Sequence, residues 1–215
     1  QTAGNNVARF DHNPTTGESL GLLIEESRTN LQVYSEEFDN SDWSKIRTTI
    51  TPNTIIAPDG TLTGDKFYVT TATGWHYMLD SNSVTSGTTY TISFYAKKAE
   101  QEYISAHFPS PQFGDSNAGN SATFNLSTGV ISNQGTYLLS ASMVDVGNGW
   151  YRCSLTKEAT STASSDLIFT LPNQSSYSTA GYTGDGYSGA YIWGAQVEQG
   201  SFPTSYIKTT GSQVT

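Results

Sequence analysis

The chain has 215 residues and a formal net charge of −9, and only 13% of its residues are charged. Binding to nucleic-acid phosphates or to anionic membrane surfaces requires basic patches, and the net negative charge disfavours both kinds of binding. We therefore expect no nucleic-acid partner. The single cysteine, Cys153, excludes an internal disulfide and any metal site built from several cysteines. No apolar run approaches the roughly 20 residues that span a bilayer, so we expect no membrane insertion.

The first thirty residues differ from the rest of the chain. An Asn-Pro pair and a Thr-Gly pair within 13–17 predict turns, and the apolar stretch "LGLLIEE" at 20–26 fits a helix or an extended hairpin arm. Because this stretch is not expected to stay exposed, we predict that residues 1–30 pack on the following domain or on a neighbouring subunit of a homo-oligomer. The chain opens at Gln1 without Met or a signal peptide, so we expect it to be a piece of a longer polypeptide.

From residue 31 the composition and the residue pattern favour β structure. Ser and Thr account for 58 residues of the chain and Tyr for another 13, and few segments favour a helix. The stretch "YTISFYAKK" at 90–98 alternates apolar and polar residues as a half-buried strand does, and Asn148-Gly149 stands between two strand patterns as a hairpin turn. The predicted strands are 31–34, 48–50, 65–70, 76–80, 90–97, 103–108, 121–125, 137–146, 150–159, 167–171 and 190–198. This series predicts an all-β fold, a jelly-roll β-sandwich of two antiparallel sheets over residues 31–215.

Sequence templates for catalysis are absent from the chain. It has no HExxH, P-loop, GxSxG or helix-opening GxGxxG motif, and its three histidines are scattered. Two carboxylates for glycosidic cleavage can be found anywhere among 19 acidic residues, but no spacing singles out a pair. We therefore predict that the chain is not an enzyme.

Six motifs resemble, in the same order along nearly the whole chain, a family of tailed-bacteriophage virion proteins found in tail-fibre, tail and capsid-decoration polypeptides. They are "RFDHNPTTGESLGLLIEESRTN", "YSEEFDNSDWSK", "YTISFYAK", "FNLSTG", "VGNGWYRCSL" and "YIWGAQVEQGSFPTSYIKTTG". The later part is also similar to β-sandwich carbohydrate-binding modules attached to polysaccharide-degrading enzymes. The resemblance implies a jelly-roll domain on the virion surface, in the tail or the capsid, that meets host or environmental glycans and other virion subunits.

The same resemblance implies a structural Ca²⁺, because such modules often hold the ion with acids of the first strand and an Asp of the last. Glu37 and Asp39 supply hard oxygen ligands in the first-strand region, but Trp193 and Gly194 stand where acids are expected in the last strand. A bound Ca²⁺ then needs backbone carbonyls in place of the missing ligand. The alternative interpretation of Glu37 and Asp39 is a solvated loop.

Sugar-binding modules stack the C–H faces of pyranose rings on aromatic side chains and add hydrogen bonds from polar side chains. Several of the aromatic residues are expected to be core instead. Trp193 shares a face with Ala195 and Val197 in the closing strand, and Trp43 is expected to pack under the first loop. Two interpretations of Trp150 stay open, since its side chain either packs at a sheet edge or exposes its ring to a ligand.

The stretch "TGWHYMLD" concentrates aromatic residues at a strand entrance. Alternation places Trp75 and Tyr77 on one face and His76 on the other, and either face can be the core. Trp75 with Tyr77 or His76, but not both, is therefore expected to form a sugar platform, beside Tyr103 and His107.

Two loops complete the predicted site. One is the loop "PSPQFGDSNAGNS", which contributes Gln112 and Asp115. The other is the Gly-rich loop "SSYSTAGYTGDGYSG", which contributes Tyr182 and Asp185. The alternative interpretation of the second loop is a mobile connection without a binding role. The predicted sugar-binding residues are Trp75, His76, Tyr77, Tyr103, His107, Gln112, Asp115, Tyr182 and Asp185. The acidic balance favours neutral or amino sugars over sulfated or uronic ones.

The leading hypothesis is a non-catalytic carbohydrate-binding domain of a phage structural protein that recognises glycans during adsorption. A second hypothesis is a structural or oligomerisation domain that decorates the virion and binds no sugar. The third is a polysaccharide-degrading enzyme.

Overall fold

The structure is a computed structural model that describes residues 10–12, 16–22 and 25–215. Sheet I contains β3 (Ser44–Ile46), β7 (Tyr77–Val84), β9 (Tyr103–His107), β10 (Ser121–Asn125), β11 (Val130–Gln134) and β14 (Ala163–Thr170). Sheet II contains β4 (Thr48–Ile55), β5 (Gly64–Val69), β8 (Thr89–Lys98), β12 (Ser140–Gly147), β13 (Trp150–Glu158) and β16 (Gly189–Gln199). Two ribbons pair β1 (Phe10–His12) with β2 (Ser19–Leu22) and β6 (Thr73–Gly74) with β15 (Tyr182–Thr183).

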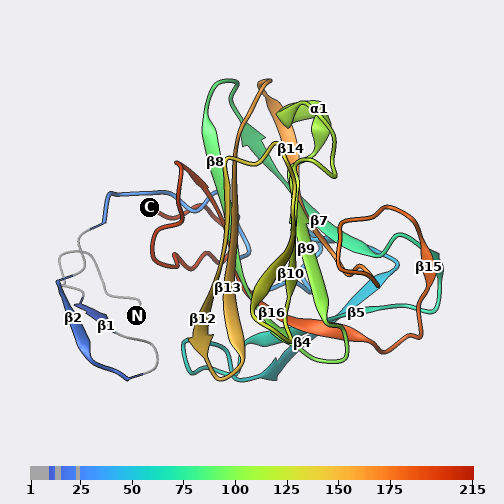
Figure 1. The fold of residues 1–215 in the computed structure, drawn as a ribbon. Coiled ribbons are helices and arrows are strands. Elements are labelled where there is room, and N and C mark those ends of the chain that lie inside the picture. The colour runs from blue at the N-terminus through green and yellow to red at the C-terminus, as the bar shows by residue number, and fades with distance from the viewer. Residues whose placement is uncertain (1–9, 13–15, 23–24) are drawn as a thin grey trace.

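The two large sheets pack on each other as a β-sandwich (Figure 1). The strand order is β11-β10-β9-β14-β7-β3 in sheet I and β12-β13-β8-β16-β5-β4 in sheet II, and neighbouring strands are antiparallel. The predicted all-β sandwich of two antiparallel sheets is confirmed, and its jelly-roll connectivity stays a prediction. The helix α1 (Ser110–Phe113) is four residues long, and no helix of the described residues is long and apolar enough to cross a membrane.

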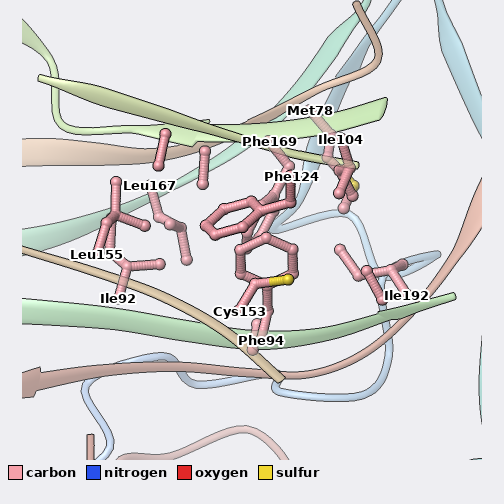
Figure 2. Close-up of a cluster of buried hydrophobic side chains, with 14 of the residues drawn as sticks. Met78, Ile92, Phe94, Ile104, Phe124, Cys153, Leu155, Leu167, Phe169 and Ile192 are labelled. Atoms are coloured by element: carbon pink, nitrogen blue, oxygen red, sulfur yellow. The ribbon is translucent and has the colours of Figure 1, made fainter. Parts of the chain in front are cut away.

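The core lies between the two sheets, where the apolar sides of their strands meet (Figure 2). The Phe94 ring of β8 lies 4.7 Å from Phe169 of β14 and 5.7 Å from Phe124 of β10, centroid to centroid, and both contacts are edge-on. Cys153 is fully buried in this core, and burial raises the pKa of its thiol well above the ordinary value. The cysteine therefore packs as a small apolar side chain.

The predicted hairpin turn at Asn148-Gly149 is confirmed. It joins β12 to β13, and its two residues have φ angles of 55° and 75°. Positive φ at both central residues is what a two-residue type I′ turn requires, which explains the Asn-Gly sequence.

Segments from both ends of the described chain meet beside β16 of sheet II. Asn30 forms a β-bridge with Val214, and its side-chain amide donates to the Ala195 carbonyl at 3.2 Å. Residues 31–34, predicted as a strand, lie here as an extended segment outside the named strands. The chain directly after β16 lies over the outer face of β8, where the Thr91 hydroxyl donates to the Gly200 carbonyl at 2.9 Å, so Thr91 is fully buried although the alternation of β8 places it on the outer face.

A bulge in β16 puts Trp193 on the face opposite to the one that alternation predicts. The register with β8 shifts between Trp193 and Gln196, where Gly194 adopts a φ of 63°. Ala195 then faces the main core, whereas Trp193 packs with Trp150 in a second buried cluster. Trp193 is buried as expected, but the prediction that it shares a face with Ala195 is wrong.

The β1–β2 hairpin lies apart from both large sheets (Figure 1). Ser19–Leu22 is a strand, which favours the extended arm over a helix for this part of the chain, and Leu20 is 61% exposed. Much of the predicted packing segment, residues 1–9, 13–15 and 23–24, lies outside the described residues. Packing of this arm on a neighbouring subunit therefore stays a prediction.

Candidate functional site

The structure decides which face of the "TGWHYMLD" stretch is core. His76 and Met78 are fully buried, whereas Trp75, Tyr77 and Leu79 are only partly buried and share the opposite face. Trp75 and Tyr77 therefore stand together on the outer side of sheet I, at the entrance to β7.

Four rings meet on this outer side, and we call them the aromatic cluster: Trp75, Tyr77, His107 and Tyr177. The Trp75 and Tyr77 rings stack with centroids 4.0 Å apart and 29° between their planes. The Trp75 centroid lies 5.8 Å from that of His107 at the end of β9. Tyr177, from the segment after β14, stands edge-on to both, at 4.8 Å from His107 and 6.2 Å from Trp75.

The β6–β15 ribbon brings the Tyr177 segment to the sheet. Gly74 has a φ of 146°, a backbone conformation that residues with a side chain rarely adopt. A Cβ on Gly181 would lie 2.4 Å from the Cα of Gly74, so the two segments approach this closely only because residue 181 is a glycine. The hydroxyls of Thr73 and Thr183 close the ribbon at 2.7 Å.

His76 and Tyr182, both predicted to bind sugar, instead hold this ribbon in place. The Nδ1 atom of His76 lies 2.7 Å from the Arg47 carbonyl and its Nε2 atom 3.1 Å from the Tyr182 carbonyl, and the ring centroid lies 4.5 Å from that of Tyr182, with the two planes tilted by 51°. The Tyr182 hydroxyl donates to the Leu171 carbonyl at 2.8 Å, and burial raises its pKa to about 12. Both residues therefore lie beside the aromatic cluster rather than in it, and the expectation that His76 is available to a ligand is wrong.

The aromatic cluster combines apolar ring surfaces with polar groups that carry no charge. His107 is fully buried, and this burial lowers its pKa to about 3, so its imidazole is neutral at physiological pH. Burial also raises the pKa of Tyr177 above its ordinary value. Partly exposed aromatic faces with neutral hydrogen-bonding groups at their edges suit a ligand that is apolar on one side and hydroxylated at its rim.

The remaining predicted sugar-binding residues are not brought to the cluster. Tyr103 shares its face of β9 with His107 but stands at the other end of the strand, opposite Asn125. Gln112 accepts the Thr160 amide with its backbone carbonyl at 2.8 Å, next to the turn between β13 and β14. The carboxylates of Asp115 and Asp185 also have partners elsewhere in the structure.

Asp115 forms an ion pair with Lys157 of β13 at 3.1 Å. Asp185 organises its own turn, because its carboxylate accepts the amides of Tyr187 at 2.9 Å and Ser188 at 2.7 Å. Hydrogen bonds from the Ser188 hydroxyl and these amides lower the pKa of Asp185 to about 2. Each carboxylate thus stabilises a loop.

No local pattern singles out Tyr177 from the three tyrosines of its Gly-rich loop. Its contacts with His107 join positions 70 residues apart. The loop holds Tyr177, Tyr182 and Tyr187, and its sequence does not say which ring returns to the sheet.

Glu37 and Asp39, the predicted Ca²⁺ ligands, lie near the buried carboxylate of Asp65. Burial raises the pKa of Asp65 to about 7, and the charges of Asp39 and Glu37 act in the same direction, against hydrogen bonds from the Asn53 and Phe38 amides. The Oε2 atom of Glu37 is buried without a hydrogen-bond partner, whereas Asp39 is exposed. Among the described residues no three His, Cys, Asp or Glu side chains form a group that could hold a metal ion. These acids are thus an incomplete fit to Ca²⁺, and its binding stays a prediction.

Comparisons with known proteins give only distant likenesses. No family model matches the chain, and no curated protein matches its sequence. One similar structure is the enzymatically active domain of bacteriophage CBA120 tailspike protein 4, with 15% identity and a TM-score of 0.47, covering 79% of this chain and 21% of that one. Another is the K1 cleaved adhesin domain of Lys-gingipain from Porphyromonas gingivalis W83, with 11% identity and a TM-score of 0.40, covering 76% of this chain and 93% of that one. The chain thus spans about a fifth of the tailspike chain, and both likenesses are too weak to carry an argument about function.

Proposed function

We propose that this chain is a non-catalytic carbohydrate-binding domain of a phage virion protein, which recognises neutral or amino sugars of host or environmental glycans. The observation that carries the sugar-binding part is the stacked pair of Trp75 and Tyr77 on the outer side of sheet I. The placement on a virion surface, in the tail or the capsid, rests on the sequence motifs.

The physical reason is the match between an aromatic face and a pyranose ring. A sugar presents axial C–H groups on its face and hydroxyls at its edge, so stacking on Trp75 and Tyr77 removes apolar surface from water while the edge stays available for hydrogen bonds. A net charge of −9 disfavours anionic sugars. A single shallow site of this kind binds weakly, and display of many copies on a particle compensates through avidity.

The test is a titration of the full chain with a panel of mono- and oligosaccharides at millimolar concentration, in which binding is measured by calorimetry or NMR. We expect binding to at least one neutral or amino sugar, and Trp75→Ala and Tyr77→Ala each to weaken it about tenfold or more. Tyr187→Ala is the matched control, because Tyr187 is 60% exposed and its ring lies over Lys66, outside the cluster. No binding to any sugar, or equal loss in the control, contradicts the proposal.

The alternative of a structural or oligomerisation domain is favoured by one observation, the exposure of Leu20 on the β1–β2 hairpin. An exposed apolar arm is a plausible contact with a second copy or another virion subunit. Light scattering tests this: a Leu20→Ser variant is expected to lower the mass of an oligomer, and a monomeric wild type contradicts self-association.

A further inference from the structure

Polar groups in and beside the aromatic cluster are buried without a hydrogen-bond partner. Within the part of the chain that the structure describes, neither Nε1 of Trp75 nor Nδ1 of His107 has an acceptor, and the hydroxyl of Thr170 is equally unpartnered. Thr170 pairs with Tyr77 on β7 and with Ser105 on β9, so it lies between the strands that carry the cluster. Buried polar groups normally have a hydrogen-bond partner, so three groups without one on a single patch of the sheet point to a ligand that supplies the missing hydrogen bonds.

The neighbouring hydrogen bonds are compatible with a proton on the unpartnered Nδ1 atom of His107. Asn117 accepts the Ser110 amide with Oδ1 at 2.7 Å, so its NH₂ group is the one that donates to the Tyr177 hydroxyl. The Tyr177 hydroxyl lies 3.5 Å from Nε2 of His107, and we assign the hydroxyl as the donor of this contact. The neutral imidazole then carries its proton on Nδ1. Trp75 Nε1–H and His107 Nδ1–H are therefore two donors without an acceptor.

The segment that packs Tyr177 against the cluster is not part of either sheet. Residues 173–181 form no strand, and in the described chain no backbone–backbone hydrogen bond joins them to either sheet. The Tyr177 ring is the part of the segment that packs on the cluster, through its edge-on contacts with His107 and Trp75. Movement of this one ring uncovers the donors without disturbing a strand.

We propose that the cluster takes the acetamido group of an N-acetylated amino sugar, and that Tyr177 moves aside to admit it. This inference rests on the proposed sugar-binding function and names the class of sugar. The acetamido carbonyl accepts hydrogen bonds from Trp75 Nε1 and His107 Nδ1, and its methyl group packs against the aromatic rings.

A carboxylated sugar offers acceptors too, but the surroundings oppose its charge. Arg47 is the cation that the described contacts place beside Trp75, and its guanidinium already donates to the Trp75 carbonyl at 3.3 Å. The net charge of −9 further disfavours an anion.

The experiment is an NMR titration of the ¹⁵N-labelled full chain with N-acetylglucosamine, glucose and glucuronic acid. The indole N–H signal of Trp75, assigned by its disappearance in Trp75→Phe, is expected to shift further at saturation with N-acetylglucosamine than at saturation with glucose. The acetylated sugar is expected to bind about tenfold more tightly than glucose, because the two donors are satisfied only by the carbonyl. His107→Phe keeps the size of the side chain roughly unchanged but removes one of the two donors, so it is expected to reduce this preference, whereas Tyr103→Phe, on the same face of β9, keeps it.

The outcomes separate this inference from the proposed function. Equal affinity for glucose and N-acetylglucosamine overturns the acetamido assignment and leaves sugar binding intact, and tighter binding of glucuronic acid overturns the preference for a neutral ligand. Failure of every sugar to bind overturns both. For the movement of Tyr177, Tyr177→Ala is expected to speed solvent exchange of the Trp75 indole proton several-fold, and unchanged exchange contradicts it.

Discussion

The Trp75 and Tyr77 rings stack with centroids 4.0 Å apart, although only one residue separates them in the chain. This contact orders both rings before any ligand arrives, so a sugar stacking on an outer ring face does not have to order two loose side chains.

The stacked pair is expected to contribute to stability as well as to binding. In a double-mutant cycle of Trp75→Ala and Tyr77→Ala, urea unfolding should reveal a coupling free energy of about 0.5–1.5 kcal/mol, the range of aromatic pairs. The pair Trp75→Ala and Tyr187→Ala serves as the control and should be additive. A coupling of zero between Trp75 and Tyr77 means that the rings do not stack in solution.

Gly181 is expected to tolerate no side chain. A methyl group there meets the Gly74 backbone at 2.4 Å, so Gly181→Ala should open the β6–β15 ribbon and lower the free energy of unfolding by about 1–3 kcal/mol. Ala180→Ser, at the exposed neighbouring position, should change stability little. Equal melting temperatures of the two variants contradict the close approach.

Asp65 is expected to make the fold less stable as the pH rises from about 4 to about 7. Its pKa is raised from an ordinary 3.8 to about 7, mainly by burial, so the folded state holds a proton over this window that the unfolded state has already lost. The free energy of unfolding therefore falls with pH there, by at most the roughly 1.4 kcal/mol per pH unit of one proton. Asp65→Asn should flatten this dependence relative to wild type, and Glu158→Gln, at an exposed site of β13, should not. A wild type whose Asp65-dependent stability rises with pH contradicts the raised pKa.

The calcium prediction can be tested by melting the chain in millimolar Ca²⁺ and in a chelator. Binding through Glu37 and Asp39 raises the melting temperature in Ca²⁺, because an ion that binds only the folded state stabilises it. Glu37→Gln and Asp39→Asn should each reduce the increase. Identical melting in both buffers shows that these acids are only a solvated loop edge.

Local sequence patterns predicted those parts of the fold that depend on neighbouring residues. The alternation around Phe94 identified the core side of β8, and Asn148-Gly149 identified its hairpin because only a few residue types adopt two positive φ angles in succession. The same reasoning failed at Trp193, where the bulge at Gly194 shifts the period of two, and a bulge is set by pairing with another strand.

For the candidate site, the sequence by itself determined that "TGWHYMLD" splits between two faces, because side chains alternate along a strand. Only the tertiary structure decided that His76 faces inward and that Tyr77 joins Trp75 outside. It also decided that Tyr177 returns to the sheet to meet His107, while Gln112, Asp115 and Asp185 do not. These outcomes depend on which distant segments pack together, and packing free energy is a property of the whole fold that no local pattern encodes.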